Sequence, residues 1–131
     1  MPTPRTRPGP GQESVWDYPR PPRLEPTNSH LRVEVAGTTV AHTSAGFRVL
    51  ETSHPPVYYF PPDSVDFRCL LPAGGQSFCD GKGIASYFTL VVGERQIESA
   101  AWTYRDPTDA FAALKDHIAF YPSKVDACFV D

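Results

Sequence analysis

Short stretches of alternating apolar and polar residues, separated by prolines and glycines, most strongly limit what this chain can fold into. The first stretch covers residues 31–35, where Leu31, Val33 and Val35 alternate with charged residues, and the pattern returns over 39–42 after a glycine at position 37. A period of two is typical of a β-strand with one buried face. The two stretches are therefore expected to form a β-hairpin.

The same reasoning predicts about eight short strands along the chain. The expected strands cover residues 31–35, 39–42, 47–52, 57–60, 65–71, 78–79, 84–92 and 95–104. The last two, joined at Gly93-Glu94, form the clearest hairpin. A single helical turn is expected at 62–64 and a turn at 72–75, because both stretches carry proline or paired glycines.

One α-helix is expected near the C-terminal end. Asp106 is a good N-cap and Pro107 suits the first helical position. Three apolar residues fall on one helical face: Phe111, Leu114 and Ile118. Tyr121-Pro122 would close the helix. The predicted fold is mainly β, a small antiparallel sheet that is closed or nearly closed like a barrel, with one C-terminal helix.

The chain is long enough for one domain with a modest core. It has 131 residues, of which 40% are hydrophobic. Eight of the fifteen prolines lie in residues 1–26, so residues 1–12 are expected to be disordered and 13–26 to form an extended arm. Trp16 and Tyr18 in that arm are costly to leave in water, so the arm is expected to pack on the domain formed by 13–131.

Cysteine usage and charge exclude several classes of protein. Three cysteines without a C-x-x-C motif argue against a disulfide framework and against a cysteine-based zinc site. A net charge of −3 gives no reason to expect a nucleic acid polymer or a membrane as partner. No apolar stretch suits a membrane span or a signal peptide, so a cytoplasmic location is expected. The oligomeric state stays open.

A glycine-flanked lysine, in Asp80-Gly81-Lys82-Gly83, is the first candidate for chemistry. It is not a Walker phosphate loop, because Gln76 and Gly83 stand where that motif needs glycine and a hydroxyl residue. The flanking glycines still allow backbone N–H groups and Lys82 to approach a phosphate or a carboxylate. The alternative is a plain turn with a solvated lysine.

Two further side chains are candidate catalytic groups. Glu51 shares the apolar strand face of Phe47 and Val49, so it needs a partner, either Arg48 or Lys82, and is a candidate base or ligand contact. A structural ion pair is the alternative.

Cys79 would be a nucleophile only if a base such as His54 lay beside it. No acid partner is evident, and a small buried hydrophobe is the favoured interpretation of this cysteine. His54 beside two prolines is in turn expected to satisfy a turn. The four histidines fall in different predicted elements, so neither a metal site nor a cofactor is predicted.

Aromatic residues with a polar tip are numerous for so small a chain. They are Tyr58, Tyr59, Tyr87, Trp102, Tyr104 and Tyr121. Such rings suit a pocket that stacks a flat ligand, for example a nucleobase. Core filling is the alternative for each ring taken singly.

Five stretches in order resemble the bacterial and fungal family called domain of unknown function 427 (DUF427). They are residues 13–22, 48–60, 79–87, 101–107 and 119–122, so the resemblance covers 13–131. It implies a small, mostly β protein with one helix, similar to the β-tent domains that hold small ligands in an aromatic cage. Many β-tent proteins bind zinc through paired C-x-x-C motifs, which this chain lacks.

The resemblance also implies a set of signature residues. They are Glu51, His54, Tyr58, Cys79, Lys82, Gly83, Tyr87, Trp102 and Tyr121. Family members often carry an aromatic residue directly before the lysine, where this chain has Gly81. Any stacking role of that position is therefore lost or moved here.

Three functions follow as hypotheses. The favoured one is a small-molecule binding domain, with a pocket formed by Arg48, His54, Tyr58, Lys82, Tyr87, Trp102 and Tyr121 together with Glu51. The second is a nucleotidyltransferase-like enzyme, as the family has been labelled, in which Lys82 and Arg48 hold phosphate and Glu51 acts as base or Mg²⁺ ligand. The third is a protein-interaction module that uses the proline-rich arm.

Overall fold

The structure is a computed structural model, which describes residues 22–131 except Ser53, Asp80 and the side chain of Cys79. The expectations for residues 1–12 and for most of the arm at 13–26 lie outside this described part. The last residues of the arm are described, and they enter the first strand of the domain.

Ten strands and three short 3-10 turns follow one another along the described chain. In order they are β1 (Arg23–Thr27), β2 (Leu31–Val35), β3 (Thr38–Thr43), β4 (Gly46–Leu50), β5 (Val57–Tyr59), η2 (Pro62–Ser64), η3 (Phe67–Cys69), β6 (Leu70–Cys79), β7 (Gly83–Val92), β8 (Arg95–Tyr104), η4 (Asp109–Leu114), β9 (Ile118–Phe120) and β10 (Ala127–Val130). The fold is mainly β, and all of its strand pairs are antiparallel.

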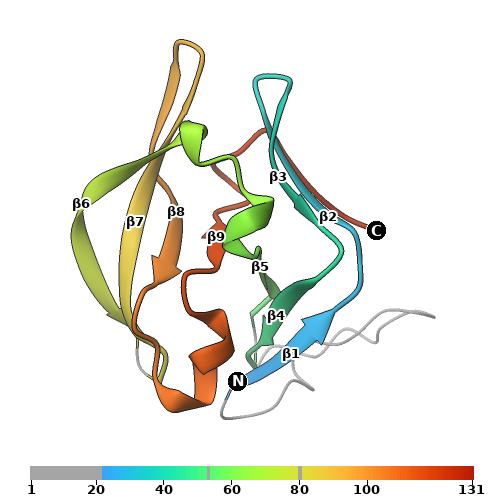
Figure 1. Ribbon diagram of the computed structural model, residues 1–131, viewed down its shortest axis with the longest axis vertical. Coiled ribbons are helices and arrows are strands. Elements are labelled where there is room, and N and C mark those ends of the chain that lie inside the picture. The colour runs from blue at the N-terminus through green and yellow to red at the C-terminus, as the bar shows by residue number, and fades with distance from the viewer. Residues whose placement is uncertain (1–21, 53, 80) are drawn as a thin grey trace, which may run out of the picture.

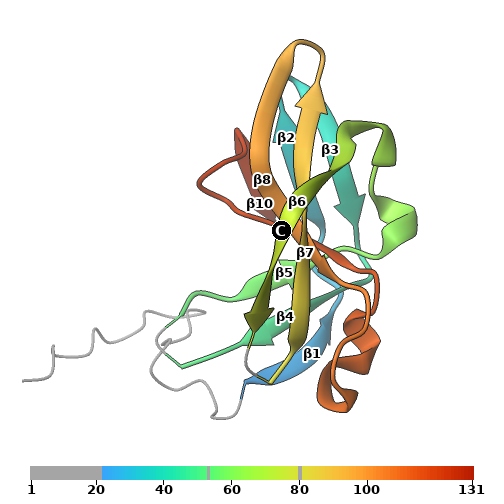
Figure 2. The same ribbon diagram turned by 90° about the vertical axis from the view of Figure 1, so that its left-hand side faces the viewer.

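The strands form three sheets that lean against one another. A four-stranded sheet, β6-β7-β8-β9, stands on one side (Figure 1), and the sheets β10-β2-β3 and β1-β4-β5 stand one above the other on the opposite side (Figure 2). Phe60 and Ile118 exchange two backbone hydrogen bonds of 2.8 and 2.9 Å, which tie the β5 end to β9. Among the described residues no continuous ring of hydrogen bonds closes the sheets, so the barrel-like expectation is replaced by three separate sheets.

Two apolar clusters fill the space between the sheets. The larger contains Leu31, Val33, Leu70, Phe88 and Leu90, and lies between the β2–β3 hairpin and the four-stranded sheet. The smaller lies between β4–β5 and the other end of that sheet, and contains Val49, Tyr59, Ala85, Tyr104, Phe111, Leu114 and Ala119. Burial of these alternating residues explains why the period of two identified most strands.

The predicted C-terminal helix is wrong. Only a 3-10 turn forms, from Asp109 to Leu114, and Phe111 interrupts it with φ −119° and ψ 21°. Asp116 then turns the chain at φ 60°, and residues 118–120 become β9. Pairing with β8 and Phe60 satisfies backbone groups of β9, and Ile118 is buried there. The apolar residues at 111, 114 and 118 therefore have helical spacing only by coincidence, because they belong to two different elements.

The predicted strand at 65–71 is also wrong in its position. The Asp66 carboxylate accepts a hydrogen bond of 3.0 Å from the backbone N–H of Arg68, which stabilises the 3-10 turn η3 instead. Phe67, expected to face the core, is 45% exposed. The strand begins at Leu70 and continues through the expected turn at 72–75 to Cys79, with an irregular register between Pro72 and Gln76.

Candidate functional site

A partly open cavity of about 300 Å³ lies between the β4–β5 hairpin and the inner face of the four-stranded sheet. One end of it is polar, and the other walls are aromatic or aliphatic. Its lining is Val49, Glu51, His54, Val57, Tyr59, Ser77, Phe78, Lys82, Ala85, Tyr87, Trp102, Tyr104 and Tyr121. Residues from five strands therefore meet at one site.

The backbone around Lys82 is fixed by two glycines and by the loop that follows β8. Gly83 has φ +125°, and a Cβ there would lie 3.2 Å from the carbonyl oxygen of Asp106, so the position favours glycine on both grounds. The N–H of Thr108 donates to the Lys82 carbonyl at 2.9 Å, and the Thr108 hydroxyl donates to the Gly81 carbonyl at 2.5 Å. The backbone of the turn is thus held in place by its hydrogen bonds with Thr108.

The Lys82 side chain points inward, and the residue as a whole is 7% exposed. Its ammonium donates to Glu51 Oε1 at 2.9 Å and lies 5.6 Å from the centre of the Phe111 ring, within the range of a cation–π contact. A buried ammonium is costly without such partners. Of the two partners expected for Glu51, the structure supplies Lys82.

His54 closes the polar end of the cavity. Its Nδ1 lies 2.9 Å from the carbonyl oxygen of Thr52, and since a carbonyl can only accept, Nδ1 carries the proton and donates. The same atom lies 3.6 Å from Glu51 Oε2. His54 thus stabilises its turn, as expected, and also borders the carboxylate.

Rings and hydroxyls form the rest of the wall. Trp102 and Tyr121 lie 4.5 Å apart between ring centres, and Tyr59 meets Trp102 edge to face at 6.2 Å. The hydroxyls of Ser77 and Tyr87 are hydrogen-bonded at 2.5 Å. Burial raises the pKa of Tyr121 above its ordinary value, and a hydrogen bond with Tyr87 adds to this effect. The Tyr121 phenol therefore stays protonated at neutral pH.

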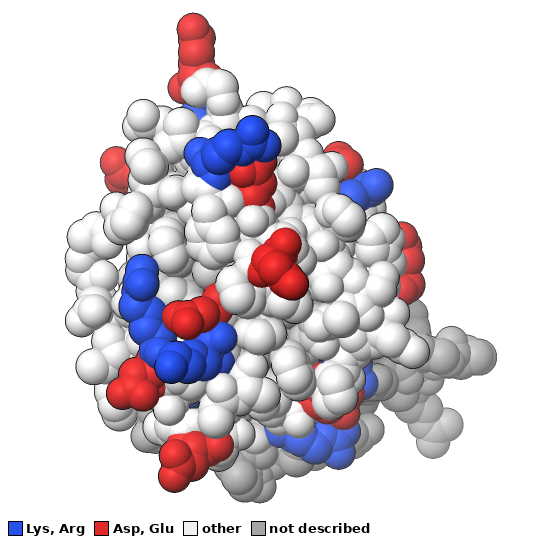
Figure 3. Space-filling view, viewed as in Figure 1, with Lys and Arg blue, Asp and Glu red and all other residues white. Residues whose placement is uncertain are grey.

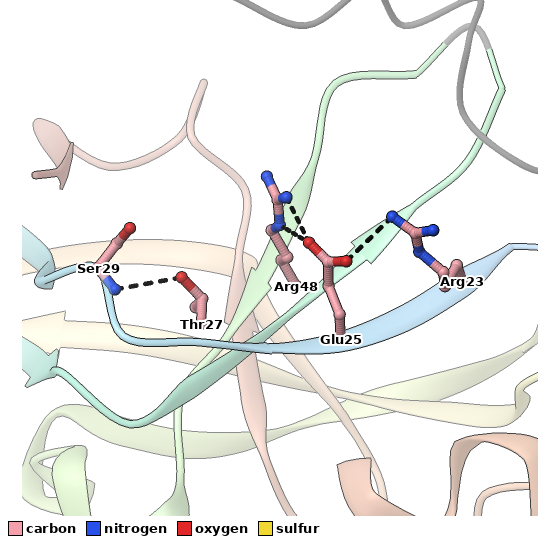
Figure 4. Close-up of polar contacts among 5 residues, drawn as sticks. All are labelled: Arg23, Glu25, Thr27, Ser29 and Arg48. Atoms are coloured by element: carbon pink, nitrogen blue, oxygen red, sulfur yellow. Dashed lines mark hydrogen bonds and ion pairs between the residues drawn. The ribbon is translucent and has the colours of Figure 1, made fainter. Parts of the chain in front are cut away.

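The structure brings six of the predicted site residues together at this cavity: Glu51, His54, Lys82, Tyr87, Trp102 and Tyr121. It does not bring Arg48 and Tyr58 there. These two are cross-strand partners on the other face of β4 and β5, and both line a separate surface hollow. The Glu25 carboxylate holds Arg48 and is also bound by Arg23 at 3.1 Å (Figure 4). The predicted pairing of Arg48 with Glu51 is therefore wrong.

Sequence reasoning left seven lining residues out of the site, of which three carry a hydroxyl group: Tyr59, Ser77 and Tyr104. Tyr59 and Tyr104 were counted among the rings but not assigned, and Ser77 was not considered. The signal for Tyr59 was available in the alternation of β4 and β5. Val49 pairs with Val57 and Phe47 pairs with Tyr59, so alternate residues of both strands lie on the cavity face. The same alternation places Arg48 and Tyr58 on the other face. Ser77 could not be found, because it lies between the predicted turn at 72–75 and the predicted strand at 78–79, whereas β6 runs through both.

Other candidate chemistry receives no further support from the described residues. No three His, Cys, Asp or Glu side chains in this part of the chain cluster as a metal site requires. The Cys79 side chain is outside the description, so its pairing with His54 stays a prediction. Cys69 is 8% exposed, and burial raises the pKa of its thiol, which fits a small buried hydrophobe.

The charged side chains on one face of the molecule are of mixed sign. On the face drawn in Figure 3, basic and acidic side chains lie next to one another and do not separate into a basic patch. Within residues 22–52, 54–79 and 81–131, no helix is long and apolar enough to cross a membrane.

Comparison with known proteins identifies the family. The model of the domain of unknown function DUF427 matches residues 23–131, which includes every residue of the cavity. The match leaves out residues 13–22, which the sequence resemblance had included. A search of curated proteins gives no match. The chain therefore belongs to the DUF427 family.

Proposed function

We propose that this domain binds a small, flat heterocycle in the cavity at Glu51 and Lys82. The observation that carries the proposal is the Lys82–Glu51 pair, with its 2.9 Å contact, at the polar end of a cavity whose other walls are rings. Ligand sites typically combine apolar and aromatic walls with a few converging polar groups. The cavity volume of about 300 Å³ is at the lower end of the usual range for ligand pockets, which suits a small ligand.

The polar end favours a ligand edge that both accepts and donates hydrogen bonds. The Lys82 ammonium is a donor only, whereas the Glu51 carboxylate is an acceptor only. A heterocycle with a carbonyl next to a ring N–H, as in uracil, offers each of them its complement. Because Glu51 is 37% exposed at its side chain, its carboxylate is accessible to such a ligand.

The aromatic walls supply stacking. Trp102 and Tyr121 present neighbouring rings, and aromatic rings pair favourably when offset or edge to face. The hydroxyls of Tyr87 and Tyr121 lie in the same wall and add hydrogen-bonding groups beside the ring faces. A flat ligand is thus favoured over a branched aliphatic one.

Phosphate recognition receives less support. Arg48, expected to help Lys82 hold a phosphate, lies outside this cavity and is bound by Glu25. Glu51 is the one carboxylate among the described lining residues, whereas metal-assisted phosphoryl transfer commonly uses several acidic ligands. The nucleotidyltransferase-like hypothesis stays a prediction, tested by incubation with nucleoside triphosphates and Mg²⁺ or Mn²⁺. The interaction-module hypothesis concerns the arm, most of which lies outside the described residues.

The experiment is a binding measurement by saturation-transfer NMR and calorimetry with uracil, hypoxanthine and nicotinamide as probes. Binding of at least one probe is expected, with a loss of about tenfold or more in Lys82→Met and Trp102→Leu, because each variant removes a hydrogen bond to a charged group or a stacking surface. Lys115→Met is the matched control, since Lys115 is exposed and does not line the cavity. Affinities that are equal in all four proteins would contradict the proposal.

A further inference from the structure

A second cavity of about 300 Å³ adjoins the first and is almost entirely apolar. It is lined by Leu31, Arg32, Val33, His54, Pro55, Pro56, Val57, Tyr58, Phe60, Trp102, Phe120, Tyr121, Pro122, Cys128, Phe129 and Val130. We call it the apolar groove. Three prolines stiffen its wall, so it is preformed and would lose little conformational entropy on binding.

The apolar groove and the polar cavity share four lining residues: His54, Val57, Trp102 and Tyr121. The neighbouring rings of Trp102 and Tyr121, tilted by 42° to one another, therefore form a wall common to both. His54, whose side chain is 63% exposed, borders both openings. A molecule whose ring occupies the polar cavity can thus extend past His54 into the apolar groove.

The chemistry of the apolar groove selects a neutral occupant. Its one guanidinium, Arg32, lies 4.4 Å from the Phe129 ring centre, and its Nε forms an ion pair of 3.3 Å with a Glu34 carboxylate oxygen, so its charge is compensated, although the buried Nε makes no hydrogen bond. Phe129 and Val130 at the rim are 38% and 47% exposed. Covering such surface is favourable for an apolar group and gives no specific gain to a charged one.

The geometry points to a ligand of two parts: a heterocyclic head in the polar cavity and a short uncharged alkyl or aryl tail in the apolar groove. This inference rests on the proposed function, because the head occupies the same site. It adds the chemical class of the ligand, a heterocycle substituted on the side away from its hydrogen-bonding edge. Continuity of the two cavities at His54 and Trp102 is the observation that joins the parts.

The test compares 1-methyluracil with 1-butyluracil by calorimetry on the full chain. Both keep the same ring edge, and they differ by three methylenes. Each buried methylene tightens binding by about fourfold, so we expect 1-butyluracil to bind at least about tenfold more tightly. Val130→Glu and Pro122→Glu, both at exposed positions of the apolar groove, should each reduce this gain to less than about twofold and leave 1-methyluracil unchanged. Leu71→Glu is the control, an exposed apolar strand residue that lines neither cavity.

The outcomes separate the inference from the proposed function. Equal affinity for both probes would overturn the tail and leave the heterocycle site standing. A gain that persists in both groove variants would place the tail elsewhere and also overturn the inference. If neither uracil derivative binds while hypoxanthine or nicotinamide does, the uracil-based two-part ligand fails and the proposed function stands. If no probe binds, both fail.

Discussion

At the scale of single residues, the Glu51–Lys82 pair is unequal in its burial. The Lys82 side chain is 9% exposed and that of Glu51 is 37% exposed, so removing the carboxylate leaves a buried ammonium, whereas removing the ammonium leaves a carboxylate that water can reach. We therefore expect Glu51→Gln to lower the free energy of unfolding by roughly 1–3 kcal/mol. Lys82→Met should cost less than about 1 kcal/mol, since an apolar side chain over Phe111 avoids the desolvation cost.

Urea denaturation of the two single variants and the double variant checks this order. In the double variant the cost of Glu51→Gln should largely disappear, because no buried charge is left to compensate. If the two single variants lost the same free energy of unfolding, or if the two losses simply added in the double variant, the buried Lys82 ammonium would not depend on Glu51 for its compensation.

Tyr121 gives a second prediction at this scale, which concerns alkaline pH. Burial, and then the hydrogen bond with Tyr87, raises its pKa above the ordinary value of 10.0. A raised pKa in the folded state contributes stability that is complete below pH 10 and is lost as the pH rises through the folded value. Ultraviolet titration should show a late-titrating phenol that is lost in Tyr121→Phe. Tyr87→Phe should shift it to lower pH, and an unchanged titration would contradict the hydrogen bond's role.

At the scale of elements, strands were predictable where burial alternated along one continuous run. The hairpin of β7 and β8 was identified from residues 84–92 and 95–104, where buried and partly exposed residues alternate over part of each strand. The prediction for the region after β8 was wrong because residues 111, 114 and 118 belong to a 3-10 turn and to β9. Local spacing cannot tell a helix from two successive elements that each bury one face. β10 was missed because its residues Ala127–Val130 are mostly exposed.

The candidate site was predictable to a similar extent. Residues that end or begin strands, such as Glu51 and Lys82, were identified from their unusual local setting. Arg48 was included for its positive charge, although the alternation already placed it on the face opposite Glu51, and it does not line this cavity. Its actual partner, Glu25, lies in β1, and only the pairing of β1 with β4 places that carboxylate opposite Arg48. Such a long-range pairing is not encoded in local spacing.

The turn between β6 and β7 carries a prediction at this scale. Gly83 combines φ +125° with a close approach to Asp106, so Gly83→Ala should lower the free energy of unfolding by about 1–3 kcal/mol and loosen the Lys82 turn. Gly74→Ala is the matched control, because a Cβ there meets nothing within 4 Å, and it should change stability by less than about 1 kcal/mol. Guanidinium denaturation measures both. A Gly83→Ala protein as stable as the control would contradict the strain.

At the scale of the whole molecule, the two sides are joined at the β9 end, and the segment between β9 and β10 passes between their two hairpins (Figure 1). Asp126, in the segment between β9 and β10, makes the second connection. Its Oδ2 accepts from the backbone N–H of Ala36 in the β2–β3 turn at 2.7 Å, and its Oδ1 accepts from Arg95 at the start of β8 at 2.5 Å. One carboxylate thus connects sheet β10-β2-β3 to the four-stranded sheet.

Asp126 therefore makes stability depend on acid pH. The N–H of Ala36, and then Arg95, holds the pKa of the Asp126 carboxyl below its ordinary value of 3.8. A lowered folded-state pKa contributes stability that is present above pH 3.8 and is lost as the pH falls through the folded value. Asp126→Asn should thus lower the melting temperature at pH 7, and the difference from the unmodified chain should shrink below pH 4. Glu94→Gln, which removes a carboxylate next to Arg95 in the sequence, should show a smaller change at pH 7. If Asp126→Asn instead melted at the same temperature as the unmodified chain at pH 7, the connection between the tips would contribute nothing, and the two sides would be held together at the β9 end and by their shared core.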